Sequence, residues 1–140
     1  MKNDTQAWRG WIWPLGFAAT IVVESSQAGV AVPGGIWQSD KLVHFLVFGL
    51  LATVTLRALR IESPRSRALV AVSLVSLFGA SDELHQYFTP GRSCDVFDWV
   101  ADTLGAGLAV GLYLWWPAWR RLLELRPRGR TDRTDDRPVT

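Results

Sequence analysis

Four apolar segments of roughly membrane length dominate this 140-residue chain and limit the folds open to it. They cover residues 11–31, 42–56, 68–88 and 96–116. An α-helix needs about 20 apolar residues to cross the hydrocarbon core of a bilayer. In lipid, every backbone polar group must also find its partner inside the protein. The sequence therefore predicts an all-α, polytopic membrane protein built as a bundle of four transmembrane helices.

The basic residues predict the orientation of this bundle. Of the 15 Lys and Arg, all except Lys41 and Arg92 precede the first segment, separate the second from the third, or follow the fourth. Because basic loops stay in the cytoplasm, we expect both termini to be cytoplasmic. The eight tryptophans fall near segment ends, where interfacial aromatic residues gather. We expect a multi-pass protein of the cytoplasmic (inner) membrane.

The sequence divides into a membrane domain and a tail. Residues 1–117 form the expected transmembrane domain, and the basic residues 118–140 form a cytoplasmic tail that is too polar to bury a core and is expected to be disordered. A secretory signal peptide is the alternative interpretation of the first segment; its cleavage would leave three helices. The lipid bilayer is an expected partner. Nucleic acid is not, because the charges form no basic face on a soluble fold.

Polar and ionisable side chains interrupt the apolar segments at one end. Counting about 1.5 Å per residue from the basic edges places most of them in one layer near the extracytoplasmic edge. Such groups are costly at this depth, so they usually pair, line a cavity or carry chemistry. We expect a single polar cluster that opens to the extracytoplasmic face, containing Glu24, Asp40, Lys41, His44, Asp82, Glu83, His85, Gln86, Arg92, Asp98 and Asp102.

The last apolar segment carries two patterns of small residues. One face holds three acids, continued by small residues that would let another helix approach closely: Asp95, Asp98, Asp102, Gly105 and Ala109. On another side, Gly107 and Gly111 form a GxxxG pattern. We expect this second pattern to pack within the bundle in preference to forming a dimer.

Two motifs carry a family resemblance. Asp-Lys-x-x-His at 40–44, and Asp-Glu-x-His-Gln with Pro-Gly-Arg at 82–92, resemble the VanZ-like family over about residues 12–116. That family comprises small polytopic bacterial membrane proteins, named for a member associated with teicoplanin resistance. The resemblance implies a role in cell-envelope homeostasis or in teicoplanin-type glycopeptide resistance. It implicates Asp40, Lys41, His44, Asp82, Glu83, Gln86, Arg92, Asp98 and Gly105; at position 102, where the family often has Asn, this chain has Asp.

Three kinds of function fit the polar cluster, and the sequence does not decide whether the protein is an enzyme. An enzyme acting on a lipid-linked phosphate or another cell-wall substrate would draw its catalytic groups from His44, Glu83, His85 and Arg92. A divalent metal would be held by His44, Asp82, Glu83 and His85. In the third interpretation, Lys41 and Arg92 neutralise some of the acids, and the network fixes the helix arrangement or recognises a partner. The acids outnumber these two cations, which favours a bound proton or cation.

Individual roles within the cluster also follow from position. Glu83 and Arg92 are expected to belong to a site. Asp98 is expected to be structural, because a helix N-terminus stabilises a carboxylate in the first turn. Glu24 interrupts an apolar segment and is expected to face the bundle interior.

Overall fold

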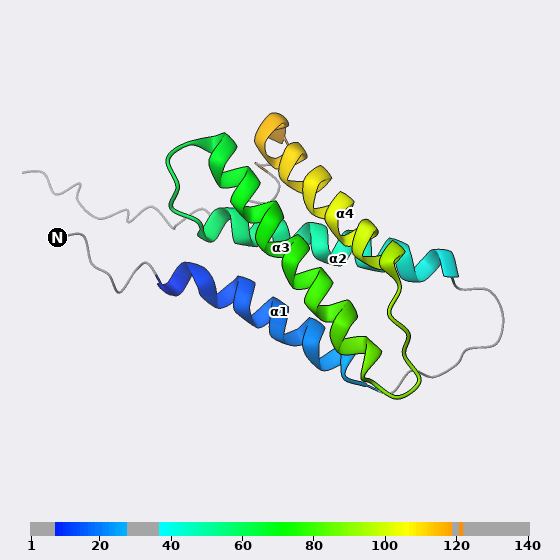
Figure 1. The fold of residues 1–140 in the computed structure, drawn as a ribbon. Helices are drawn as coiled ribbons and strands as arrows, with labels where there is room; N and C mark the ends of the chain where they lie inside the picture. Colours follow the sequence, from blue (N-terminus) through cyan, green and yellow to red (C-terminus); the bar gives the residue numbers. More distant parts are fainter. Residues whose placement is uncertain (1–7, 28–36, 119–120, 122–140) are drawn as a thin grey trace, which may run out of the picture.

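The computed structural model describes residues 8–27, 37–118 and 121, without the side chains of 37–40. Across this part of the chain there are four α-helices and no strand, which confirms the all-α prediction. The short 3-10 helix η2 (Trp8–Trp11) leads into α1 (Ile12–Ser25), which α2 (Trp37–Ala58), α3 (Pro64–Tyr87) and α4 (Val96–Trp115) follow. The helices alternate in direction, so the α3–α4 loop lies at the end of the bundle where α1 ends and α2 begins (Figure 1).

Side-chain caps set the starts of α3 and α4. Ser63 Oγ accepts a hydrogen bond from the Ser66 N–H at 3.3 Å, and Pro64 occupies the first helical position, where a missing N–H costs nothing. Asp95 Oδ1 accepts a hydrogen bond from the Phe97 N–H at 2.8 Å. Both helices therefore begin at polar residues that flank the apolar segments.

Helix α1 ends at Ser25, before the predicted boundary at 31. The carbonyl of Val22 accepts hydrogen bonds from both the backbone N–H and the hydroxyl of Ser26, at 3.0 and 2.6 Å. Such a side-chain bond competes with the helical ladder. The boundary predicted from apolarity alone is wrong here; residues 28–31 lie outside the described part of the chain. At about 21 Å, α1 is shorter than a bilayer core.

The surface of the bundle is apolar and part of its interior is acidic. Large apolar side chains such as Trp13, Leu69 and Phe97 are more than two-thirds exposed, whereas the buried acids are Asp82, Glu83, Asp98 and Asp102. Two helical stretches, Lys41–Ala58 and Pro64–Tyr87, are long and apolar enough to cross a membrane. This distribution is the one that lipid favours and points to a membrane location.

Helix α4 packs mainly on α2, through glycine. A Cβ atom at Gly105 would lie 2.8 Å from the carbonyl carbon of Phe45 and would overlap the oxygen of that carbonyl. A Cβ at Gly49 would lie 3.0 Å from the Gly105 oxygen and 3.2 Å from the Ala109 Cβ. The predicted close approach along Gly105 and Ala109 is confirmed.

The GxxxG pair Gly107 and Gly111 faces away from the bundle. Apart from the neighbouring backbone of α4 itself, a Cβ at either position would meet no described atom within 4 Å, and both glycines line an apolar groove on α4. Two residues along a helix correspond to a turn of about 200°. Because Gly105 faces α2, Gly107 faces outward. The expected packing of this pattern within the bundle is therefore wrong.

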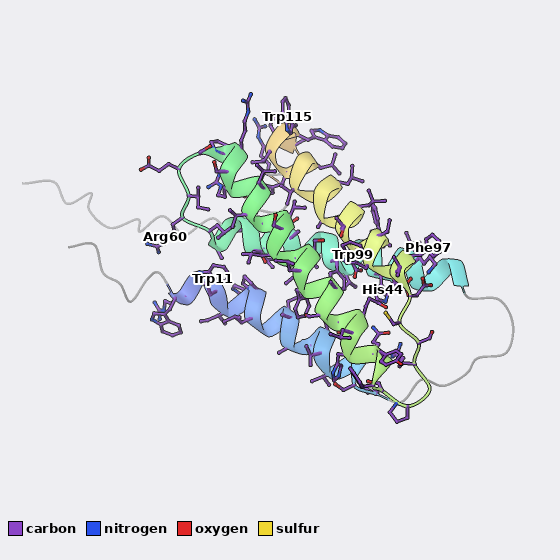
Figure 2. All side chains as sticks on the ribbon, viewed as in Figure 1. Trp11, His44, Arg60, Phe97, Trp99 and Trp115 are labelled. Atoms are coloured by element: carbon purple, nitrogen blue, oxygen red, sulfur yellow. The ribbon has the colours of Figure 1, made fainter. Side chains whose placement is uncertain are left out.

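The two ends of the bundle differ in chemistry. Trp11, Arg60 and Trp115 lie toward one end, and His44 and Phe97 lie toward the other (Figure 2). The basic α2–α3 loop therefore lies at the end opposite the polar cluster.

Candidate functional site

Polar side chains from all four helices meet at the end of the bundle that carries the α3–α4 loop. They come from the last turn of α1, the start of α2, the last turns of α3 and the start of α4. Alternating helix direction brings these segments together although they are far apart in sequence (Figure 1). The contacts link Ser25 to Asp82, Ser26 to His85, Lys41 to Asp95 and Asp98, and His44 to Asp102.

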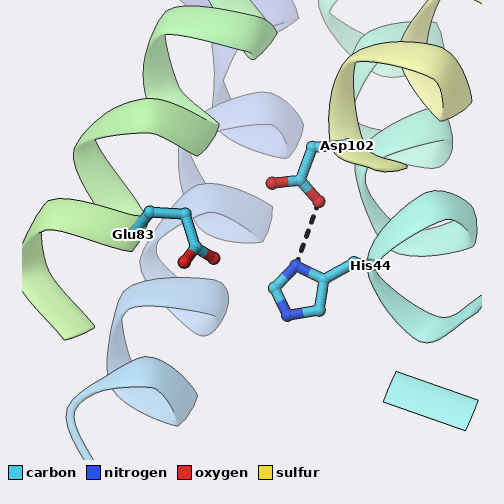
Figure 3. Close-up of side chains that lie close together, drawn as sticks. All are labelled: His44, Glu83 and Asp102. Carbon is cyan, nitrogen blue, oxygen red and sulfur yellow. Dashed lines mark hydrogen bonds and ion pairs between the residues drawn. The ribbon is translucent and has the colours of Figure 1, made fainter. Parts of the chain in front are cut away.

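At the centre lie His44, Glu83 and Asp102, the three-helix cluster. His44 Nδ1 is 3.0 Å from Asp102 Oδ1, and the His44 ring stacks on Phe48 with centroids 5.9 Å apart. One potential ligand atom from each member of the cluster lies within 4.8 Å of the others. The three side chains point toward one another from α2, α3 and α4 (Figure 3). This grouping pairs an imidazole with two carboxylates in the protein interior.

Two oxygens of the three-helix cluster have no hydrogen-bond partner among the described residues. They are Glu83 Oε1 and Asp102 Oδ2, and both are buried. The other Glu83 oxygen accepts a hydrogen bond from the Asp95 N–H at 2.8 Å. Gly79 makes room for Asp102, since a Cβ there would lie 2.8 Å from Oδ2. Burying an ionised oxygen without a partner is costly, so this cluster favours a bound proton or cation.

Asp82 belongs to a neighbouring group. Its Oδ2 accepts hydrogen bonds from Ser25 Oγ at 2.9 Å and from Gln86 Nε2 at 3.1 Å. Its Oδ1 is buried with no partner in the described part of the chain. The Ser25 bond fastens the end of α1 to α3, whereas Gln86 holds the Asp82 carboxylate from within α3.

His85 lies away from the three-helix cluster. Its side chain is exposed, and its Nε2 is 2.9 Å from Ser26 Oγ. Residues two apart on a helix do not share a face, so His85 and Glu83 cannot both point inward. The predicted metal set of His44, Asp82, Glu83 and His85 is therefore not brought together, and Asp102 takes the place of the second histidine.

Lys41 joins two acids at the start of α4. Its Nζ lies 2.6 Å from Asp95 Oδ2 and 2.6 Å from Asp98 Oδ1; we name these three residues the lysine clamp. The hydrogen bond from Lys41, aided by that from the Phe97 N–H, lowers the pKa of Asp95 below its ordinary value. Lys41 is thus engaged by carboxylates of its own chain, in keeping with the structural role expected for Asp98.

Arg92 reaches back to the end of α1. It donates long hydrogen bonds to the carbonyl oxygens of Glu24 and Gln27, at 3.3 and 3.4 Å. The preceding Gly91 has φ 76°, a conformation that favours glycine. The Glu24 side chain is not buried, although it is part of the wall of the cavity described below. The buried position at this end of α1 belongs to Ser25, which lies four residues after the buried Ile21 on the same face of the helix.

A cavity of about 330 Å³ lies beside the three-helix cluster, between α1, α2 and α3. Much of its wall is apolar and comes from Phe17, Ile21, Val43, Val47 and Phe48. The remaining wall is largely polar and includes Glu24, Ser25, His44, Asp82, Gln86 and Arg92. The cavity thus joins an apolar compartment to ionisable groups.

Some site residues lie beyond the predicted set or beyond the described side chains. Ser25 and Gly79 were not predicted, although a glycine inside a helix is itself a signal of close approach. Asp40 belongs to the predicted cluster, but its side chain lies outside the described part of the chain.

Comparisons with known proteins agree with the resemblance seen in the motifs. A protein of the fission yeast Schizosaccharomyces pombe, described as uncharacterized, is 30% identical over 112 residues, which cover 80% of this chain and 68% of the relative. No solved structure matches the chain. Residues 25–117 match the VanZ/LLP1 family, and this range contains α2, α3, α4 and the whole three-helix cluster. The chain is a member of the VanZ/LLP1 family.

Proposed function

We propose that this chain is a multi-pass membrane protein that binds an anionic, lipid-like molecule of the cell envelope and performs acid–base chemistry on its head group. The observation that carries this proposal is the cavity between α1, α2 and α3, which joins an apolar wall to His44 and Arg92. An amphipathic ligand matches both parts of that wall.

The size and lining of the cavity favour a lipid head group with the first part of its chain. Ligand sites are mostly apolar concavities of about 300 to 1,000 Å³ with a few placed polar groups, and this cavity is near the lower end of that range at about 330 Å³. Phe17, Ile21 and Val47 offer contacts to methylene groups. The guanidinium of Arg92 suits a phosphate, because its planar fork can donate two parallel hydrogen bonds.

His44 is the group best placed for proton transfer. It lines the cavity, and Asp102 holds its ring at 3.0 Å. An imidazole oriented by a buried carboxylate is the usual arrangement of a general base or acid. Proton transfer to or from a head-group oxygen, or a water beside it, is the chemistry that this pair would perform.

In the proposed topology all four helices cross the membrane, with η2 extending the short α1. Both termini are cytoplasmic and the cavity opens outward. The separation of Arg60 from His44 along the bundle supports it (Figure 2), because basic loops stay in the cytoplasm. We place the protein in a bacterial inner membrane, with a role in envelope homeostasis or teicoplanin-type glycopeptide resistance. The relative in a yeast supports a lipid as the ligand in preference to a bacterial cell-wall polymer, because a yeast has membrane lipids but no bacterial cell wall.

The native cysteine tests this orientation. Cys94 is exposed in the α3–α4 loop, so a membrane-impermeant maleimide should label it in intact spheroplasts. In a Cys94→Ser background, a cysteine introduced at Ser63 in the basic α2–α3 loop should react only after permeabilisation. External labelling at position 63 would contradict the topology.

Arg92 tests the proposed ligand. For purified protein in detergent, we expect native mass spectrometry to show phosphatidic acid bound in preference to phosphatidylcholine. Arg92→Ala should weaken phosphatidic acid binding at least 10-fold, since one charge-assisted hydrogen-bond pair contributes about 1.5–3 kcal/mol. Arg60→Ala, at the opposite end of the bundle, is the matched control and should bind like the wild type.

Equal binding of the two lipids, or equal losses in the Arg92 and Arg60 variants, would rule out head-group recognition in this cavity. The teicoplanin sensitivity of cells that express each variant is also measured and normalised to the membrane abundance of the protein. This measurement connects lipid binding to the envelope phenotype. A lost phenotype at normal abundance is expected for His44→Ala and Arg92→Ala.

A further inference from the structure

We propose that the three-helix cluster is a binding site for a divalent transition-metal ion of the zinc type. Its ligands are one ring nitrogen of His44 and one carboxylate oxygen each from Glu83 and Asp102. This inference rests on the proposed function, because it names a cofactor for the same site. With an ion bound, His44 would be a ligand, and the ion would supply the acid–base chemistry by polarising a water or a head-group oxygen.

The donor types of the cluster, one imidazole and two carboxylates, are among those that zinc binds. The three ligand atoms lie within 4.8 Å of one another, whereas ligands of a tetrahedral zinc ion are about 3.4 Å apart. Side-chain rotations of the kind that accompany metal binding can close this difference. Three protein ligands leave one position for water or substrate, and the wall of the cavity beside it includes His44.

The buried oxygens give independent support. Glu83 is 3% exposed and Asp102 is 0% exposed, yet Glu83 Oε1 and Asp102 Oδ2 have no hydrogen-bond partner in the described part of the protein. Buried polar atoms are almost always satisfied, so each exception calls for an explanation such as an ion. A cation between the carboxylates would satisfy them.

The charge balance also favours a cation. Asp82, Glu83 and Asp102 are all buried. Within the described residues, the ion pair that reaches these three acids is His44 with Asp102, while Lys41 pairs with Asp95 and Asp98. Buried charges are stable when they are paired or coordinate a metal. A doubly charged ion would offset two of the three carboxylates.

Neighbouring groups hold the proposed ligands in place. The Asp95 N–H fixes one oxygen of Glu83 at 2.8 Å, and Phe48 stacks on the His44 ring. Gly79 provides the space that the Asp102 carboxylate occupies. Such surrounding contacts usually orient metal ligands and tune their affinity. A bound ion would polarise a head-group oxygen or a water in the cavity.

Zinc binding to purified, detergent-solubilised protein tests this site. After EDTA treatment and its removal, equilibrium dialysis against Zn²⁺ with elemental analysis should give one ion per chain and an increase in Tm. Glu83→Gln and Asp102→Asn preserve side-chain shape, and each should weaken zinc binding at least 10-fold. Co²⁺ in place of Zn²⁺ should give the visible absorption of a tetrahedral site in the wild type and lose it in both variants.

Glu62→Gln is the matched control, because it removes an exposed carboxylate from the α2–α3 loop, away from the three-helix cluster and the cavity. It should bind zinc like the wild type. Less than half an ion per chain, or equal losses in the Glu62 and Glu83 variants, would overturn the proposal. If Asp102→Asn does not fold, as judged by circular dichroism, the decision passes to Glu83→Gln and the Co²⁺ spectrum.

The metal site and the lipid site can fail separately. Phosphatidic acid binding measured in EDTA depends on Arg92 and the apolar wall, so Glu83→Gln should retain it. Zinc binding depends on the three-helix cluster, so Arg92→Ala should retain that. Zinc binding without lipid binding would refute the proposed ligand alone, and the reverse result would refute the metal site alone.

Discussion

Gly105→Ala is expected to lower the free energy of unfolding of the bundle by about 3 kcal/mol, the upper end of the usual cost of overpacking a core. The added Cβ would overlap the backbone carbonyl of Phe45, whose carbon would lie only 2.8 Å away. Neither group can rotate aside, because one is fixed to the α4 backbone and the other is part of α2. The two helices must therefore separate or shift.

Gly107→Ala is the control for this change. A Cβ at Gly107 meets no described atom within 4 Å, so only helix propensity should act, stabilising the helix by about 0.8–1 kcal/mol. Unfolding of the purified protein by SDS titration, followed by circular dichroism, measures both variants. Similar free energies for the two alanine variants would show that α2 and α4 do not approach closely at Gly105.

The position of the polar cluster along the bundle could be predicted from the sequence with the helix rise of about 1.5 Å per residue. Counting the helix rise from the basic edges placed His44, Glu83 and Asp102 in one layer, and the structure has them within reach of one another. This was possible because consecutive apolar segments run in opposite directions, so the depth of each residue can be counted from the basic end of its own helix. The close approach at Gly105 was predicted from the helical spacing that places Gly105 and Ala109 on the same face as Asp98 and Asp102.

The choice of partners within that layer could not be predicted. Depth says how far a residue lies along a helix, but the rotation of each helix about its axis depends on packing. For this reason Asp102 was expected only as a general member of the cluster, whereas His85 was expected as a ligand. The two-residue spacing of Glu83 and His85 could have excluded His85 as a ligand beside Glu83, since such neighbours face different sides of a helix.

Helix ends were predicted less well than helix interiors. Apolarity continues past Ser25, but the Ser26 hydroxyl bonds the Val22 carbonyl and the helix stops. Glu24 is exposed, whereas Ser25, on the same helix face as the buried Ile21, donates a hydrogen bond to Asp82. The rotation of α1 about its axis therefore decided which of two adjacent residues is buried in the site, and hydropathy could not show it.

Lys41→Met is expected to destabilise the protein by about 2 kcal/mol, less than the 3–5 kcal/mol typical of breaking a fully buried ion pair. The lysine clamp joins the start of α2 to the start of α4 through two contacts of 2.6 Å. Its side chains are partly exposed, except for Asp98, whose side chain is 9% exposed. Removing the ammonium leaves that carboxylate without its cation, which is where most of the cost arises.

The double variant Lys41→Met/Asp98→Asn separates this cause from a loss of packing. Neutralising Asp98 removes the unpaired charge, so the double variant should regain at least half of the stability that Lys41→Met loses. No recovery would mean that the lysine stem, and not its charge, joins the two helices. Asp98→Asn alone should be only mildly destabilising, because Lys41 keeps its contact with Asp95.

The lysine clamp should also show itself in the acid limb of the stability curve. Because the folded-state pKa of Asp95 is lowered, its contribution is complete above the unfolded-state pKa of about 3.9 and disappears as the pH falls through the lower folded-state value. The difference in stability between the wild type and Lys41→Met should therefore be constant from pH 7 to about pH 5 and shrink below about pH 4. SDS titrations of both proteins across this range measure that difference. A constant gap down to pH 3 would show that the ammonium of Lys41 does not stabilise an ionised Asp95, and the attachment of α2 to α4 would then depend on Gly105 and its neighbours.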